Sequence, residues 1–121
     1  MMKTILFAFF GVLVLGHAAA WAEDARFFSM LNDVPLMGGL YELPKDGVSF
    51  DKPEGRIVET AAASETINSN EIRAFYASAL PQLGWAATGP DAYARGGEKL
   101  TLRLESAKSL NIVHFSLSPQ E

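Results

Sequence analysis

Cysteine is absent from the 121-residue sequence, and histidine occurs only twice. Without cysteine the chain cannot form disulfides, thiolate zinc sites, iron–sulfur clusters or thiol nucleophiles, and it has no lipoprotein cysteine to acylate. Basic residues are also few, with ten Lys and Arg against fourteen Asp and Glu. Because a nucleic-acid-binding protein needs clustered positive charge, we expect no nucleic-acid partner. The length is that of one small domain.

The first 22 residues have the pattern of a signal peptide. Lys3 precedes an apolar stretch over residues 4–16, which is shorter than the roughly 20 residues that a membrane span requires. Ala22 ends an A-x-A cleavage pattern, and Ala20 ends a second one; the alternative is an uncleaved anchor. We predict cleavage after Ala22 or after Ala20 and an exported protein, periplasmic in a Gram-negative cell and not integral to a membrane. Loss of Lys3 would leave nine basic and fourteen acidic residues, a net charge of −5.

The first half of the remaining chain predicts an irregular segment and then a hairpin. Residues 23–46 are interrupted by two prolines and a glycine pair, so we expect no long element there. Residues 47–50 and 56–60 are rich in β-branched and aromatic side chains. Between them, Pro53 and Gly55 are residues that favour a turn. We predict a β-hairpin across this turn.

A helix and a series of strands follow. Asn68 and Glu71 have the spacing of a capping box, and apolar residues then recur at helical spacing up to Leu83. Beyond residue 85 the pattern is that of short strands, and Leu100, Leu102 and Leu104 alternate strictly with polar residues. We predict an α+β fold for residues 47–121, with an antiparallel sheet of four to five strands and one main helix packed on one face.

Several phrases of the sequence resemble a family of small exported bacterial proteins of uncharacterised function. Phe75-Tyr76 followed by Leu80-Pro81-Gln82-Leu83-Gly84-Trp85 matches their "FY-x(3)-LPQLGW" stretch. Residues 33–37 (DVPLM) precede a "FDKPEGRI" hairpin at residues 50–57, as they do in that family. The similarity covers roughly residues 33–117. It implies export and a sheet-plus-helix module, and it supplies no catalytic residue.

Motifs for metal binding or catalysis are not apparent. Outside the leader, His114 is the only histidine, and the sequence contains no H-E-x-x-H zinc motif. The nucleophile motif G-x-S-x-G is missing too, and the two glycine pairs lie in no phosphate-binding fingerprint. We interpret His114 as a partly exposed strand residue. We expect no metal, no cofactor and no catalytic residue, which favours a binding protein over an enzyme.

Two groups of residues are candidates for binding. Leu36, Met37, Leu40 and Tyr41 form an adaptable apolar group with polar neighbours, which suits the surface for an envelope protein partner. The alternative is that this segment folds over the sheet and closes the core. A partner could also engage an edge of the sheet.

A second hypothesis is a small-molecule carrier or minor enzyme. Tyr76, Trp85 and Tyr93 would then line a pocket between the helix and the sheet, where their polar atoms could orient a ligand. The helical spacing of the aromatic residues around Tyr76 favours packing between helix and sheet over a ligand pocket. The sequence therefore offers an interaction module first and a ligand carrier second.

Overall fold

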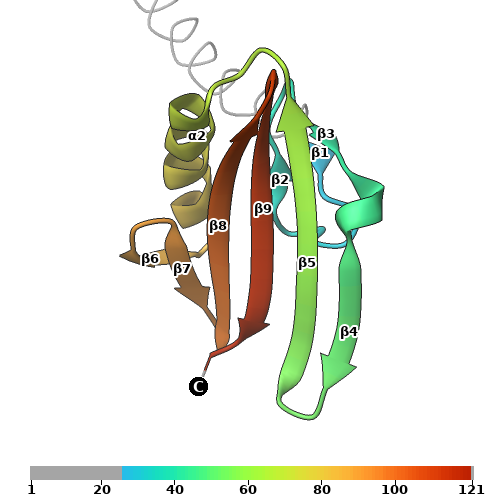
Figure 1. The fold of residues 1–121 in the computed structure, drawn as a ribbon. Helices are drawn as coiled ribbons and strands as arrows, with labels where there is room; N and C mark the ends of the chain where they lie inside the picture. Colours follow the sequence, from blue (N-terminus) through green and yellow to red (C-terminus); the bar gives the residue numbers. More distant parts are fainter. Residues whose placement is uncertain (1–25, 121) are drawn as a thin grey trace, which may run out of the picture.

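The computed structural model describes residues 26–120, and the predicted signal peptide lies outside this range. One α-helix packs on a mostly antiparallel sheet, so the predicted α+β class is confirmed (Figure 1). The prediction of four to five strands was too low, because the main sheet has seven strands and a separate sheet has two. The shortest members are two residues long and therefore too short to leave an alternating pattern in the sequence.

The main sheet runs in the order β3-β5-β9-β8-β7-β6, and β4 pairs with β5 alongside β3. All of its pairings are antiparallel. Its long central strands are β5, β8 and β9, with ten residues each. The strands of this sheet are β3 (Tyr41–Glu42), β4 (Val48–Lys52), β5 (Gly55–Ser64), β6 (Ala86–Gly89), β7 (Ala92–Arg95), β8 (Glu98–Ala107) and β9 (Leu110–Pro119).

Tight turns join these strands, and one of them is the turn that the sequence predicted around Pro53 and Gly55. The hairpin between β4 and β5 pairs Lys52 with Gly55 across the predicted turn. Gly96 and Gly97 both have positive φ, at 54° and 85°, as the mirror-image turn between β7 and β8 requires. Lys108 also has positive φ, at 55°, and it joins β8 to β9. Backbone geometry at these points sets the register of the sheet.

Helix α2 (Ser69–Gln82) begins and ends as its sequence predicts. The Asn68 side chain accepts from the Glu71 N–H at 2.8 Å, and the Glu71 carboxylate accepts from the Asn68 N–H at 3.0 Å. Gly84, with φ of 93°, follows the end of the helix and reverses the chain toward β6. The buried face of α2 packs on the sheet and consists of Ile72, Tyr76, Ala79 and Leu80.

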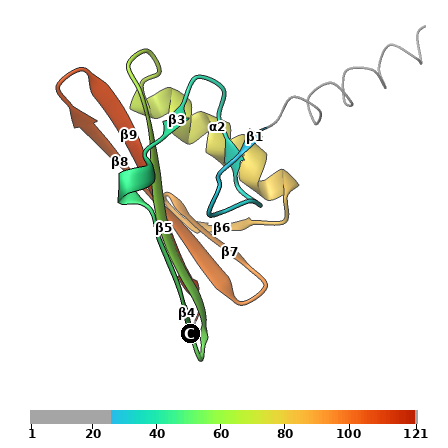
Figure 2. The ribbon, with the colours of Figure 1, turned by 90° about the vertical axis from the view of Figure 1, so that its right-hand side faces the viewer.

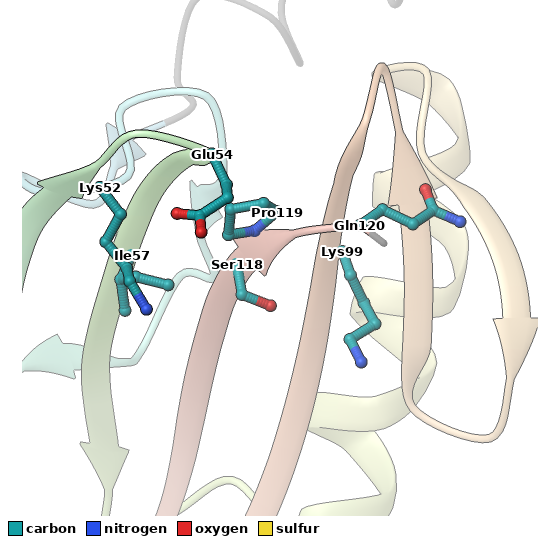
Figure 3. A pocket seen from close by; sticks show the side chains of 7 residues that line it. All are labelled: Lys52, Glu54, Ile57, Lys99, Ser118, Pro119 and Gln120. Atoms are coloured by element: carbon teal, nitrogen blue, oxygen red, sulfur yellow. The ribbon is translucent and has the colours of Figure 1, made fainter.

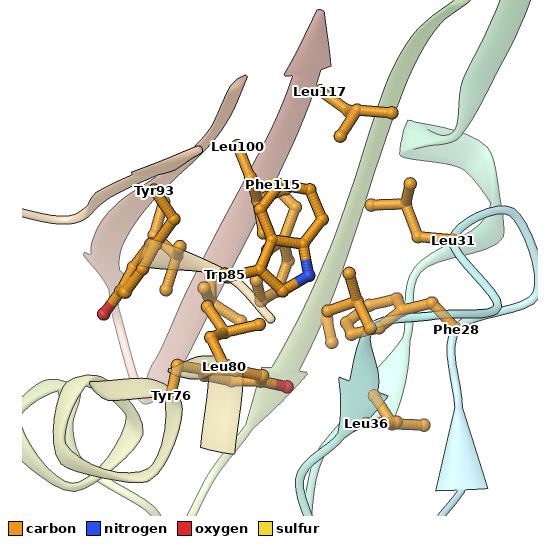
Figure 4. Packing of buried hydrophobic residues seen from close by; sticks show 14 of the residues in the cluster. Phe28, Leu31, Leu36, Tyr76, Leu80, Trp85, Tyr93, Leu100, Phe115 and Leu117 are labelled. Atoms are coloured by element: carbon orange, nitrogen blue, oxygen red, sulfur yellow. The ribbon is translucent and has the colours of Figure 1, made fainter. Parts of the chain in front are cut away.

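The core lies between the sheet on one side and α2 with the N-terminal segment on the other (Figure 2). Strands β1 (Arg26–Phe27) and β2 (Pro35–Leu36) pair with each other in that segment, and the 3₁₀ helix η1 (Pro44–Asp46) leads into β4. The segment shares one core with residues 47–120 (Figure 4), to which it contributes Phe28, Leu31, Val34, Leu36 and Leu40.

Candidate interaction surface

The structure divides the predicted partner-binding residues between the core and the surface. Leu36 and Leu40 are buried, with 7% and 2% of their surface exposed. Met37 is partly buried and packs against the core. Tyr41, on β3, is 43% exposed. For the two leucines the structure supports the alternative in which this segment closes the core, and only Tyr41 remains open to a partner.

A buried tyrosine holds this segment on the helix. The Tyr76 hydroxyl donates to the Pro35 carbonyl at 2.7 Å and accepts from the Met37 N–H at 3.2 Å. Burial raises the pKa of Tyr76, because the phenolate would lose its solvation there. The neutral hydroxyl thus satisfies two backbone groups that are about 40 residues away along the chain.

A cluster of charged side chains joins the same segment to the sheet. Asp33 pairs with Arg95 of β7, and its Oδ2 also lies 3.6 Å from the Arg56 guanidinium on β5. Arg56 in turn donates to both oxygens of Glu98, at 2.8 and 3.1 Å. The hydrogen bond to Glu98 and the nearby negative charges raise the pKa of Arg56. Since every partner belongs to a different element, we interpret this cluster as structural.

The aromatic residues of the alternative hypothesis lie in the core. Tyr76 and Trp85 are buried completely or nearly so, and Tyr93 is 7% exposed. The Tyr76 ring packs edge-on against Phe115 with 5.0 Å between centroids, and the Arg95 guanidinium lies 4.3 Å from the centre of the Trp85 ring. Desolvation, followed by the charge of Asp91, raises the pKa of Tyr93. Side chains therefore occupy the space where this hypothesis requires a ligand.

Three of the five large apolar side chains that are exposed among the described residues lie at one edge of the main sheet, whereas Phe27 is on β1 of the small sheet. On β4, Val48 and Phe50 are 49% and 50% exposed, and this strand pairs only with β5 among the described residues. Tyr41 on β3 lies along the same edge of β5. Met30 is also 39% exposed, but its thioether contacts Gly47 on the face opposite to Val48. We call the surface made by Tyr41, Val48 and Phe50 the β3–β4 edge.

Acidic residues slightly outnumber basic ones around the β3–β4 edge. The basic residues are Lys45, Lys52, Arg56, which is engaged with Glu98, and Arg26, which donates to the Leu40 carbonyl at 3.4 Å. The acidic residues on or beside β3 and β4 are Glu42, Asp46, Asp51, Glu54 and Glu59. A partner for this edge would therefore combine apolar side chains with positive charge.

A groove lies at the ends of the strands, close to the hairpin between β4 and β5 (Figure 3). Its volume is about 500 Å³. In the close view, the Ser118 hydroxyl lies between the ammonium groups of Lys52 and Lys99. We call this the strand-end groove; it is lined by Lys52, Glu54, Ile57, Lys99, Ser118, Pro119 and Gln120.

Several polar side chains of β5, β8 and β9 are paired with one another. His114 Nε2 lies 2.7 Å from a Glu105 oxygen, and the Ser116 hydroxyl donates to Glu59 at 3.0 Å. Ser49 and Lys52 have the spacing of a serine–lysine pair, but alternation along β4 directs them to opposite faces. Between residues 26 and 120, no group of three or more metal-ligating side chains comes together.

The sequence offered a partial signal for the β3–β4 edge. Val48 and Phe50 alternate with Ser49, which predicts that they share one face of a strand. Whether a second layer covers that face depends on contacts far along the chain, so their exposure could not be foreseen. No local pattern in the sequence indicates the strand-end groove. Lys52 and Lys99 are distant in sequence, and they line the same groove only because their strands belong to one sheet.

Comparisons with known proteins add no further constraint. No protein-family model, no curated protein and no solved structure matches this chain. In the part of the chain that the structure describes, no helix is both long enough and apolar enough to cross a membrane.

Proposed function

We propose that this protein is an exported, periplasmic interaction module without catalytic activity, and that it binds an envelope protein through the β3–β4 edge. The observation that carries the proposal is the exposure of Val48 and Phe50 on a strand with only one neighbour in the described sheet. The leader pattern before residue 23 supports export.

Two physical properties of β4 support binding by strand addition. A strand at the edge of a sheet has backbone N–H and C=O groups on its outer side, which an extended segment of another chain can pair with. Large exposed apolar side chains on the same strand would add to the contact, because their burial is favourable by roughly 25 cal/mol for each Å². All five residues of β4 are exposed, so no other described element covers this strand where a second strand would be added.

Charge favours a basic partner over a second copy of this chain. Two copies paired along β4 would bring their acidic surroundings together, and this repulsion opposes association. An extended segment with apolar side chains and Lys or Arg would satisfy both the exposed apolar side chains and the carboxylates. We therefore assign the edge to a basic, extended segment of a different protein.

In-cell photo-crosslinking tests the proposal. The crosslinker replaces Phe50 in one variant and Tyr41 in another, and Thr88 on β6 serves as the control because β6 forms the opposite edge of the sheet. The expected result is one discrete adduct from the first two positions, identified by mass spectrometry, and none from Thr88. In a second step, the purified partner should slow hydrogen exchange at the β4 amides, and Phe50→Ser should abolish that protection.

Three results would contradict the proposal. An adduct made only of two copies of this chain would assign the edge to self-association. Equal adducts from Thr88 and Phe50 would show that the crosslinker reports proximity without a preferred surface. Normal exchange at the β4 amides in the presence of the captured protein would place its binding site elsewhere.

A further inference from the structure

The strand-end groove combines positive charge with apolar surface. Positive charge comes from Lys52, the last residue of β4, and from Lys99 on β8. Apolar surface comes from Ile57 on β5 and from the ring of Pro119 at the end of β9. We propose that the groove binds an organic anion, namely a single carboxylate or phosphate group joined to an apolar body. This site adjoins the β3–β4 edge at Phe50 and goes beyond the function proposed above.

Three side chains with hydrogen-bond donors line the groove, namely Lys52, Lys99 and Ser118. Figure 3 shows the ammonium groups of Lys52 and Lys99 on either side of the Ser118 hydroxyl. Among the described residues, neither ammonium group forms an ion pair with a carboxylate. Lys99 and Ser118 are direct neighbours across the β8–β9 pairing, so the sheet holds two of the three donors together. An anionic oxygen placed near Ser118 could accept from Ser118 and Lys99, and the Lys52 ammonium adds positive charge to the same groove.

The apolar surface of the groove continues from Ile57 on β5 onto the neighbouring strand β4. Ile57 pairs with Phe50 across the hairpin, and Phe50 is half exposed on the same face. An apolar chain of a ligand could therefore lie over Ile57 and extend toward Phe50 while its anionic group stays at Ser118. The volume of about 500 Å³ falls in the range typical of small-molecule sites.

Glu54 lowers the positive charge of the groove. Its carboxylate lines the groove together with the two lysines, so these three side chains carry one positive charge in excess. An anionic ligand is attracted by the lysines and repelled by Glu54. Variants of Glu54 and of the lysines should therefore change the affinity in opposite directions. Neutralising Glu54 should strengthen binding, whereas neutralising either lysine should weaken it.

The experiment titrates the ¹⁵N-labelled protein with four probes and follows amide chemical shifts. Octanoate and octyl phosphate carry the proposed chemistry, octylamine reverses the charge, and inorganic phosphate lacks the apolar body. The expected result is a saturable shift at Ile57, Ser118 and Gln120 with the first two probes only. The tighter of these two identifies the source of the anionic group as a carboxylate or a phosphate.

Charge-neutralising variants give the quantitative part of the test. Lys52→Gln and Lys99→Gln should each weaken binding of the tighter probe about two- to fivefold, as expected for exposed ion pairs. Glu54→Gln should tighten binding about twofold on the same basis. Lys108→Gln is the matched control, because Lys108 is exposed in the β8–β9 turn at the other end of those strands.

Each of the opposite outcomes would overturn the inference. Shifts with octylamine equal to those with octanoate would contradict the assignment to an anion. Inorganic phosphate binding as tightly as octyl phosphate would contradict the apolar part of the site. Unchanged affinity in both lysine variants, relative to Lys108→Gln, would show that the groove does not hold the anionic group. Amide spectra of the variants that match the wild type elsewhere would confirm that they are folded.

Discussion

Removing the hydroxyl of Tyr76 tests how the N-terminal segment is held on the core. Tyr76→Phe keeps the ring, its edge-on packing against Phe115 and the volume of the side chain. It removes the oxygen that accepts from the Met37 N–H and donates to the Pro35 carbonyl. The variant therefore changes two buried hydrogen bonds and leaves the apolar contacts intact.

The expected loss of stability follows from the two backbone groups that would be left without a partner. A buried polar group that loses its hydrogen bond costs roughly 1–3 kcal/mol. Water could reach part of this site, because Met37 is only partly buried. We expect the free energy of unfolding to fall by about 2–4 kcal/mol. For a domain of this size, that corresponds to a decrease in Tm of about 10 °C or more.

Two measurements separate this effect from a general change in packing. Chemical denaturation gives the free energy of unfolding, and hydrogen exchange reports the local opening of the segment at the Met37 amide. Tyr93→Phe is the matched control, since Tyr93 lies in the core but its hydroxyl takes no part in the hydrogen bonds of Tyr76. We expect the control to change stability by less than about 0.5 kcal/mol.

The reasoning would be refuted by equal stabilities of the Tyr76→Phe and Tyr93→Phe variants. It would also be refuted by a large loss of stability with unchanged exchange at Met37, because the damage would then lie elsewhere in the core.

Three further predictions concern pH, the helix terminus and the charged cluster. Because burial raises the pKa of Tyr76 above its ordinary 10.0, the neutral hydroxyl stabilises the fold below about pH 10, and that contribution is lost as the pH rises further. Denaturation at about pH 8 and about pH 11 should show this loss in the wild type and a smaller one in Tyr76→Phe. Asn68→Ala should lower the free energy of unfolding by about 1 kcal/mol through loss of the capping box, and the exposed Asn70→Ala should change it little. Asp33→Asn should cost about 1 kcal/mol in the same assay, with a smaller effect at high salt, because the ion pair with Arg95 is partly open to solvent.

Local chemistry was sufficient to predict the helix and most of the sheet. Asn68 and Glu71 identify the start of α2 because a capping box depends on residues three apart. The buried positions of Leu100 and Leu102 follow from strict alternation along β8. Such patterns lie within one element, so a single sequence contains all the information that they need.

Contacts between distant segments account for what the sequence could not predict. The region around Leu36 and Leu40 is interrupted by proline and glycine, so it has no period from which a buried face could be recognised. Its place in the core depends on Tyr76, about 40 residues later. For the same reason, the exposure of Phe50 depends on which face of the sheet the helix covers, and no local pattern specifies that.

The position of β9 has a consequence for how the chain acquires its structure. This strand is the last of the described elements, yet it lies between β5 and β8 in the middle of the sheet and pairs with both. The part of the sheet that contains β5 and the part that contains β8 cannot be joined until β9 has been synthesised. The pairing of β5 with β9 closes loops of about 50 residues. Folding should therefore be slow and should follow synthesis, since non-local pairings carry a large loop-closure entropy. A chain that stays unfolded for this interval would suit the export proposed above, because a narrow translocation channel admits only an unfolded chain.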